Sequence, residues 1–342
     1  MGSLVLLGLA LLWAGLALAA VVPDFSLCNE YFYGGVVPQG LDTPNTANIC
    51  QKLESKYHFA TLYDKSWRIP VWAAYKLGTR KGQVQCEGKW KVEPQLSKAE
   101  DASLENIQRM TEEKKLNLKD PSVLKKSQAI LQDYEKTGYD QGHLNPNSYQ
   151  CGKGHREATY TLTNAVPMHP EFNRKIWYAL ERNLNKQLKD KCINVKGTPF
   201  LVTGVVPNTN LKIPDKVEDQ KKNIQRDDAR VVVPSHVWTA VCCDHSDNNK
   251  KFSFAFLGEN KPNSNLEHLS VAELSTKLRQ LYGFANTHAV KIFKDDCNAG
   301  SAEAQNIASA IEAELHKAAL KREGDDSSHT LPPPKKPKDV QG

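Results

Sequence analysis

The chain has 342 residues, 40% of them hydrophobic, with a formal net charge of +6 and a pI near 8.7. A chain of about 300 residues buries roughly 75% of its unfolded surface, so the composition allows a full globular core and excludes a wholly disordered protein. The mild positive charge favours a polyanion beside a positive cleft, but it is too small for a protein that coats nucleic acid.

The N-terminus carries an uncharged apolar run over residues 3–22 that ends in small residues. Ala17-Leu18-Ala19 fits the small-x-small cleavage pattern of a secretory signal peptide, so we expect residues 1–19 to be removed and the protein to be secreted. The alternative is a retained signal anchor, because about twenty apolar residues are just long enough to span a bilayer.

The cysteine count indicates disulfides, because an even number in a secreted chain is typical of a disulfide framework. A zinc site is not expected, since no C-x-x-C spacing occurs; Cys151 and His155 come nearest to a ligand pair, and we expect a disulfide at Cys151 instead. Cys242 and Cys243 follow a strand-like run, so they should point to opposite faces and find different partners. The eight cysteines are Cys28, Cys50, Cys86, Cys151, Cys192, Cys242, Cys243 and Cys297.

The sequence of the first half of the chain predicts an N-terminal arm, a β-hairpin and an insertion. Residues 20–55 are rich in proline and glycine and predict an irregular arm pinned by disulfides. Alternating apolar residues at 58–63 and 71–77 predict a β-hairpin. Residues 95–138 are highly charged and predict a partly helical insertion.

The second half alternates predicted strands and helices. A helix should begin near Glu171, with Ile176, Leu180, Leu184 and Leu188 as a buried stripe and Trp177 as core packing. The C-terminal region, 301–342, predicts a helix with Ile307, Ile311 and Leu315 on one face, followed by a disordered tail rich in proline and lysine. Strands are expected at 158–162, 198–206, 231–241 and 251–257, and a serine-capped helix at 270–281.

The segment from Tyr139 to Gln150, Y-D-Q-G-H-L-N-P-N-S-Y-Q, contains the best candidate for catalysis. His143 follows a glycine and precedes an asparagine-rich turn, which suits an imidazole at the rim of a cleft. A neutral imidazole accepts a proton near pH 7, although a single histidine is more often an ordinary surface or core residue.

This segment resembles the D-R-G-H signature of the DNA/RNA non-specific endonucleases of the ββα-metal type. A second block from Thr161 to Glu181 resembles the other signature of that family, with Asn164, Asn173, Trp177 and Glu181 at matching spacing. The likeness spans roughly residues 55–300 and implies an endonuclease domain over 20–300 with an α+β fold. Its central sheet should be mainly antiparallel, flanked by helices and stapled by disulfides.

The resemblance also implies roles for individual residues. His143 would be the general base, Asn173 the direct ligand of a hydrated Mg²⁺, with Mn²⁺ as an alternative ion, and Glu181 would act through the metal-bound waters. Asn164 would shape the site beside His143, and the substrate would be DNA or RNA held through its backbone. A single neutral oxygen ligand fits Mg²⁺, which gives up its waters reluctantly.

The sequence departs from the family signature where phosphate would bind. Gln141 replaces the arginine of D-R-G-H, and Gly88-Lys89-Trp90 stands where a second arginine is expected, which leaves Lys89 or Arg80 as substitutes. The chain is therefore read as a secreted metal-dependent endonuclease. The alternatives are a weak or inactive nuclease fold that binds nucleic acid or a protein partner, and a disulfide-rich extracellular interaction protein.

Overall fold

A computed structural model describes residues 20–78, 86–298 and 301–327, with side chains described up to residue 318. The predicted signal peptide, Arg80 and the proline-rich tail lie outside these ranges. Within them, no helix is both long enough and apolar enough to pass through a lipid bilayer.

The fold is organised around one eight-stranded sheet whose strands pair in the order β1-β2-β3-β4-β7-β8-β9-β10, all antiparallel. This confirms the expected α+β class with a mainly antiparallel sheet. The strands are β1 (Val21–Val22), β2 (Thr46–Leu53), β3 (Lys56–Asp64), β4 (Ile69–Lys76), β7 (Thr198–Ile213), β8 (Val231–Asp244), β9 (Phe252–Glu259) and β10 (Leu266–Leu269).

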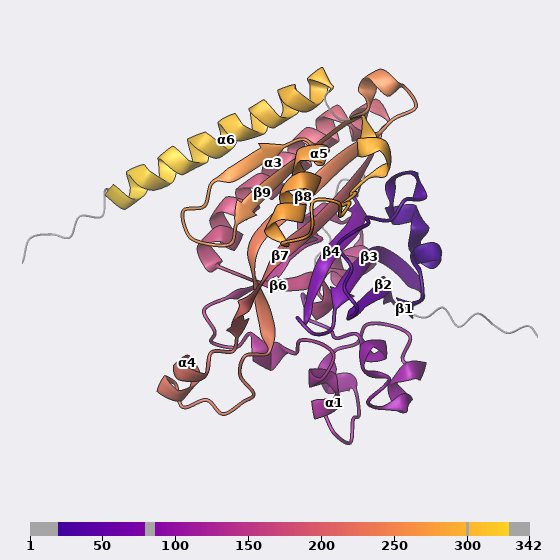
Figure 1. Cartoon of the computed structure of the whole chain (residues 1–342), viewed down its shortest axis with the longest axis vertical. Helices are drawn as coiled ribbons and strands as arrows, with labels where there is room; N and C mark the ends of the chain where they lie inside the picture. The colour runs from indigo at the N-terminus through magenta and orange to yellow at the C-terminus, as the bar shows by residue number, and fades with distance from the viewer. Residues whose placement is uncertain (1–19, 79–85, 299–300, 328–342) are drawn as a thin grey trace, which may run out of the picture.

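Both faces of the sheet are covered, so its strands are apolar on both sides. Along β8, Val237 and Val241 enter one core and Trp238 and Ala240 enter the other, as the period of two requires. The first core is covered by α3 (Tyr178–Lys191) and α6 (Ala302–Ser327), which lie side by side in Figure 1, and the second by α5 (Val271–Leu281).

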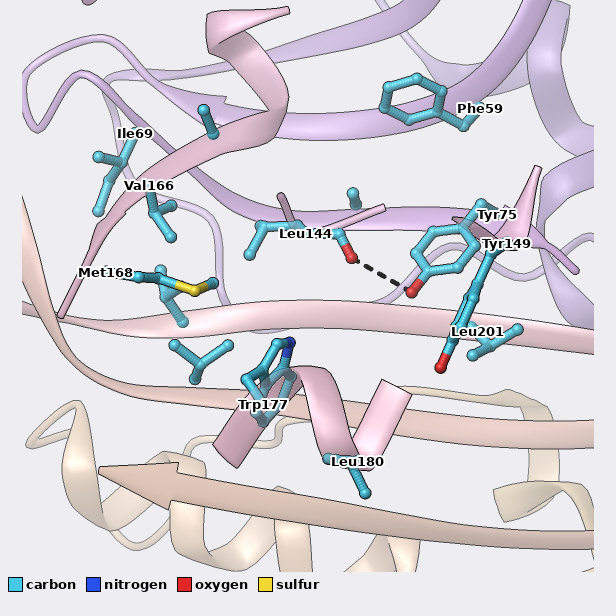
Figure 2. Close-up of a cluster of buried hydrophobic side chains, with 14 of the residues drawn as sticks. Phe59, Ile69, Tyr75, Leu144, Tyr149, Val166, Met168, Trp177, Leu180 and Leu201 are labelled. Atoms are coloured by element: carbon cyan, nitrogen blue, oxygen red, sulfur yellow. Dashed lines mark hydrogen bonds between the residues drawn. The ribbon is translucent and has the colours of Figure 1, made fainter. Parts of the chain in front are cut away.

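A separate two-stranded ribbon carries the predicted catalytic segment. It consists of β5 (Asp140–His143) and β6 (Ala165–Met168), and the chain then enters a π-helical turn (Phe172–Trp177) that leads directly into α3. Figure 2 shows how this ββα unit packs on the sheet: Leu144 and Met168 lie in the core, and the Tyr75 hydroxyl donates to the Leu144 carbonyl at 3.2 Å. The large sheet therefore fixes the position of the turn that follows His143.

Several predicted elements differ from the structure. The arm over 20–55 is not irregular throughout, because residues 46–53 form β2 of the main sheet. The insertion over 95–138 contains 3-10 segments and only one short α-helix, α1 (Ser122–Lys125). The strand predicted at 158–162 is wrong, because the chain there ends α2 (Lys153–Ala158) and enters a 3-10 turn at Leu162–Asn164.

The C-terminal helix is confirmed and belongs to the first core. Ile307 and Ile311 of α6 are fully buried, and Leu315 packs against the same cluster. The domain core thus continues past residue 300, where the sequence suggested that it ends.

Three disulfides staple the fold. Cys28–Cys50 fastens the N-terminal arm to β2, Cys192–Cys243 joins the end of α3 to β8, and Cys242–Cys297 joins β8 to the segment after α5. The different partners of Cys242 and Cys243 confirm the prediction from strand alternation. None of the three disulfides between described residues includes Cys151, so the disulfide expected at Cys151 is not found.

A buried ion pair ties the insertion to the sheet. Arg230, at the start of β8, donates to Asp133 Oδ1 at 2.7 Å and to the carbonyl oxygens of Lys125 and Gln128 at 2.8 and 3.2 Å. Both charged side chains are at most 9% exposed. The guanidinium therefore organises the loop that leads into the catalytic segment, and its charge is matched by a single carboxylate. The charged loop between β7 and β8 contains α4 (Lys216–Lys221).

Candidate active site

His143 is the last residue of β5, and its ring is enclosed by two aromatic side chains. The ring centroid lies 4.8 Å from that of Trp90 and 4.9 Å from that of Tyr160, the latter edge-on at 89°. Gly142 packs against Met168, since a Cβ at this position would lie 2.3 Å from the methionine side chain. The glycine in this motif therefore lets the ribbon sit close to the core while the next residue, His143, faces the other way.

The imidazole of His143 is held neutral. Its Nε2 is buried and has no hydrogen-bond partner among the described residues. Burial lowers the pKa of His143 to about 4, because the charged form would lose its hydration. The ring is therefore in the unprotonated form that a general base needs, while the lowered pKa makes it a weaker proton acceptor than a free imidazole.

Asn164 holds the turn beside His143 and makes its contacts only to backbone. Its Nδ2 donates to the carbonyls of Asn145 and Thr159 at 3.0 and 2.9 Å, and its Oδ1 accepts from the Asn145 amide at 2.9 Å. The side chain is fully buried. These bonds use its acceptor and both donors, so Asn164 positions the segment after His143 and has no group left for substrate.

Asn173 lies in the π-helical turn, and its amide orientation is fixed. Its Nδ2 donates to Asp140 Oδ2 at 3.0 Å, and a carboxylate can only accept, so the Asn173 Oδ1 must point away from Asp140. Asp140 is held in turn by Arg174, whose Nε and Nη2 reach its two oxygens at 2.8 and 2.5 Å. Asp140, at the start of β5, thus connects the ribbon to the proposed ligand.

Glu181 lies near the start of α3, about two turns after Asn173, beside the segment that follows His143. It lines a small cavity with Leu144 and Pro146, and its backbone carbonyl accepts from the Tyr149 hydroxyl at 2.8 Å. Burial raises the pKa of Glu181 to about 8, so the carboxyl is largely protonated at neutral pH unless a cation lies nearby. Within the described ranges, the Glu181 carboxyl makes no hydrogen bond to His143 or Asn173.

The two residues expected to contact phosphate, Gln141 and Lys89, lie on different segments of the chain. Gln141 is two residues before His143 in β5, so both side chains leave the ribbon on the same side. Lys89 is exposed and pairs with Glu87, next to Trp90 on the wall beside His143. The Lys89 ammonium is therefore already engaged by Glu87, whereas Gln141 shares one side of the ribbon with His143.

Three neighbours of the site were not assigned roles from the sequence. Trp90 and Tyr160 enclose His143, and Arg174 orients Asp140. The signal for Arg174 was its place directly after Asn173. Trp90 and Tyr160 lie 53 and 17 residues from His143 in the sequence, so only the tertiary fold brings them to it.

The donor set fits one hydrated, hard divalent cation. Asn173 Oδ1 is an oriented amide oxygen, and the Glu181 carboxyl lies on the same helix two turns on. Across the described ranges, no three His, Cys, Asp or Glu side chains converge on one point as they would in a closed zinc site. An ion bound here would keep most of its waters, as Mg²⁺ does when held by one or two protein oxygens.

Comparison with known proteins places this site in a family. Residues 37–287 match the profile of the DNA/RNA non-specific endonucleases. The chain is 31% identical over 219 residues to the human Endonuclease domain-containing 1 protein and 27% identical over 288 residues to the mouse one, covering 64% and 84% of this chain. It is also 28% identical over 153 residues to mitochondrial nuclease EXOG from Xenopus laevis, which covers 42% of this chain.

The chain spans only 39% and 51% of the lengths of the human and mouse relatives, and 38% of the Xenopus nuclease. Among solved structures, the EndoG/EndoGI complex aligns with a TM-score of 0.43 and 17% identity over 71% of this chain and 90% of that one. Members of the matched family generally depend on a divalent metal. The profile match covers most of the chain, including His143, Asn173 and Glu181, and the chain therefore belongs to the DNA/RNA non-specific endonuclease family.

Proposed function

We propose that the protein is a secreted, metal-dependent endonuclease that hydrolyses phosphodiester bonds of DNA and RNA without sequence specificity. The single observation that carries this proposal is the neutral, aromatic-enclosed His143 with an unsatisfied Nε2 on the same short ribbon as Asp140, which orients Asn173. Three disulfides support the proposed passage through an oxidising compartment.

His143 takes the proton from the attacking water in this mechanism. Trp90 and Tyr160 hold the ring in place and exclude bulk water, so the nitrogen that receives the proton is ready before the substrate arrives. Asn173 would hold Mg²⁺, which, when bound, supplies positive charge for the transition state and an acidic water for the leaving oxygen. Glu181 would accept hydrogen bonds from waters bound to the metal, and a cation nearby would favour its carboxylate form.

A basic groove along α3 offers a path for the nucleic acid backbone. It has a volume of about 270 Å³ and is lined by Ser148, Tyr178, Arg182, Asn185, Lys186 and Lys189. Tyr178 is 54% exposed, and among the described side chains none of the three cations has a carboxylate within ion-pair distance. Exposed cations beside an aromatic ring suit a phosphate backbone with a stacked base. These cations lie on the helix that carries Glu181, where they would partly replace the charge missing at Gln141.

Digestion of supercoiled plasmid and of unstructured RNA by the purified secreted protein tests the function. Both substrates should be cut with Mg²⁺ present, and EDTA should abolish cleavage because Asn173 alone cannot neutralise the developing charge on phosphorus. Cleavage that continues in EDTA would remove the metal from the mechanism. Tight binding without cleavage under Mg²⁺ and Mn²⁺ would favour the inactive nucleic-acid-binding alternative, for which Gln141 in place of arginine is the specific argument.

Gln141→Arg should increase the rate of cleavage. The strand places residue 141 on the same side as His143, and a guanidinium there would make charge-assisted, bidentate bonds to phosphate that are roughly twice as strong as those of a neutral amide. Rates measured from low to high salt should show a steeper dependence in the variant, because a new phosphate contact releases counterions.

Gln305→Arg is the matched control, since it adds the same charge at an exposed position of α6. It should leave the salt dependence almost unchanged. If Gln141→Arg behaves like this control while the wild-type enzyme is active, another cation, such as those of the α3 groove, already contacts the phosphate.

A further inference from the structure

A second group of side chains lies away from His143, where β3 meets α2. His58 of β3 and His155 of α2 face each other with their Nδ1 atoms 3.1 Å apart and their ring centroids 4.6 Å apart at 84°. The pair borders a pocket of about 430 Å³ that Glu30, Lys76 and Cys151 also line. His58 is buried, whereas His155 is exposed, so the contact can be reached from solvent.

The tautomers of this pair follow from its neighbours. His58 Nε2 lies 3.4 Å from the Leu53 carbonyl, which can only accept, so Nε2 carries the proton and His58 Nδ1 presents a lone pair. His155 Nδ1 must then be the donor in the contact between the two rings. Burial, together with the proximity of the rings, lowers the pKa of His58 to about 4, and burial and Lys56 lower that of His155, so both rings are neutral at pH 7.

The hydrogen bond from His58 to the Leu53 carbonyl is of the kind that orients metal-binding histidines. A ligating imidazole usually donates its other N–H to a carbonyl or carboxylate, which fixes the ring and the tautomer, and Leu53 does this for His58. Two nitrogens each about 2.0–2.1 Å from one tetrahedral zinc ion are about 3.3 Å apart, close to the 3.1 Å seen here. If His155 takes the tautomer with its proton on Nε2, each of the two Nδ1 atoms, 3.1 Å apart, presents a lone pair.

We propose that His58 and His155 bind one borderline transition-metal ion, Zn²⁺ or Cu²⁺, through their Nδ1 atoms, with water in the remaining positions. On binding, His155 changes tautomer: the N–H bond at Nδ1 breaks, an N–H bond forms at Nε2 through proton exchange with solvent, and two nitrogen–metal bonds form. Imidazole nitrogens suit these ions, whereas Mg²⁺ requires oxygen ligands, so this site is chemically distinct from the one at Asn173. Lys56 and Lys76 oppose the added charge, and Glu30, which pairs with Lys76 at 3.5 Å, partly offsets them.

A bound ion would connect β3 to α2, the helix that leads into Thr159 and Tyr160 beside His143. α2 ends at Ala158, and the next two residues are Thr159, whose carbonyl holds Asn164, and Tyr160, which packs on His143. The ion would therefore act as a cross-link between the sheet and this segment and should raise the melting temperature, since it binds the folded state alone.

Titration of the full-length protein with Zn²⁺, followed by calorimetry in two buffers of different ionisation enthalpy, tests the proposal. Wild type should bind one ion with little net release of protons, because both rings are neutral before and after binding, and excess Mg²⁺ should not compete. His155→Gln should weaken this binding by at least about tenfold, the loss typical of even an outer-shell change, while its melting temperature in EDTA stays at the wild-type value. His316→Gln, which removes an exposed histidine of α6, is the control and should bind as wild type does.

Electron paramagnetic resonance of the Cu²⁺ form provides a second readout on the unmodified chain. Two coordinated imidazole nitrogens are expected, and affinity should be higher for Cu²⁺ than for Zn²⁺ or Ni²⁺. Equal Zn²⁺ affinity in wild type and His155→Gln, or no saturable binding by wild type, would overturn the proposal and leave the pair as a hydrogen bond between two neutral rings.

Discussion

Replacing His143 with alanine is expected to lower the rate of plasmid cleavage by about a hundredfold or more, the scale of a lost general base. The ring nitrogen that accepts the proton disappears, while Asn164 still holds the turn through its bonds to Asn145 and Thr159. The measurement is the initial rate of plasmid nicking with Mg²⁺, alongside circular dichroism and the melting temperature to verify folding. Added imidazole should partly restore the rate, because it can occupy the space between Trp90 and Tyr160.

The rate of cleavage by the wild-type protein should depend on pH in the way that the lowered pKa of His143 predicts. Because the pKa of His143 is lowered to about 4, the ring stays unprotonated across the neutral range, and the contribution of the base should be lost only as the pH falls toward that value. His245→Ala removes a surface histidine and should leave both rate and pH profile unchanged. A fully active His143→Ala variant would show that another group accepts the proton.

Asp133→Ala should reduce the free energy of unfolding by about 3–5 kcal/mol, as expected when one partner of a buried ion pair is removed. Asp133 is 3% exposed at its side chain and is the carboxylate that neutralises Arg230, so the variant leaves a guanidinium buried without a countercharge. The measurement is urea denaturation at pH 7 with the disulfides intact.

Glu218→Ala provides the comparison on the surface. Glu218 pairs with Lys221 at 2.8 Å, but its side chain is 48% exposed, so its loss should change stability far less than the loss of Asp133 does. A similar small change for Asp133→Ala would mean that water reaches Arg230 once the carboxylate is gone. The double variant Asp133→Ala with Arg230→Met should recover much of the lost stability, since no charge is then buried.

Much of this fold could be predicted because strand alternation and helix periodicity are local properties. The separate partners of Cys242 and Cys243 follow from the period of two, and the buried stripe from Ile176 to Leu188 follows from the helical repeat. The prediction of a strand at 158–162 was wrong because the conformation there does not follow from the local pattern. Thr159, Thr161 and Thr163 have β propensity, but their hydroxyls are used in other contacts. Thr159 donates to the Arg156 carbonyl, Thr161 bonds to Thr163, and Thr163 accepts from the distant Gln51 at 2.8 Å.

The candidate site also has features that the sequence predicts and features that only the tertiary fold creates. The spacing of His143, Asn173 and Glu181 is visible in the sequence, whereas the enclosure of His143 and the contact of Asn173 with Asp140 arise only when β5, β6 and α3 pack together. The shifted pKa values of His143 and Glu181 come from burial, which no local pattern reveals.

The adjacent cysteines of β8 give the chain an unusual covalent connectivity. Cys243 closes a loop that runs back to Cys192, and Cys242 closes one that runs forward to Cys297, so the two rings overlap at a single peptide unit. A protease that cuts the exposed loop between β7 and β8, or any bond between β8 and Cys297, therefore leaves both fragments attached to each other. Such a nicked molecule would keep α3, β8 and the segment after α5 in one piece, which suits an enzyme proposed to work among extracellular proteases.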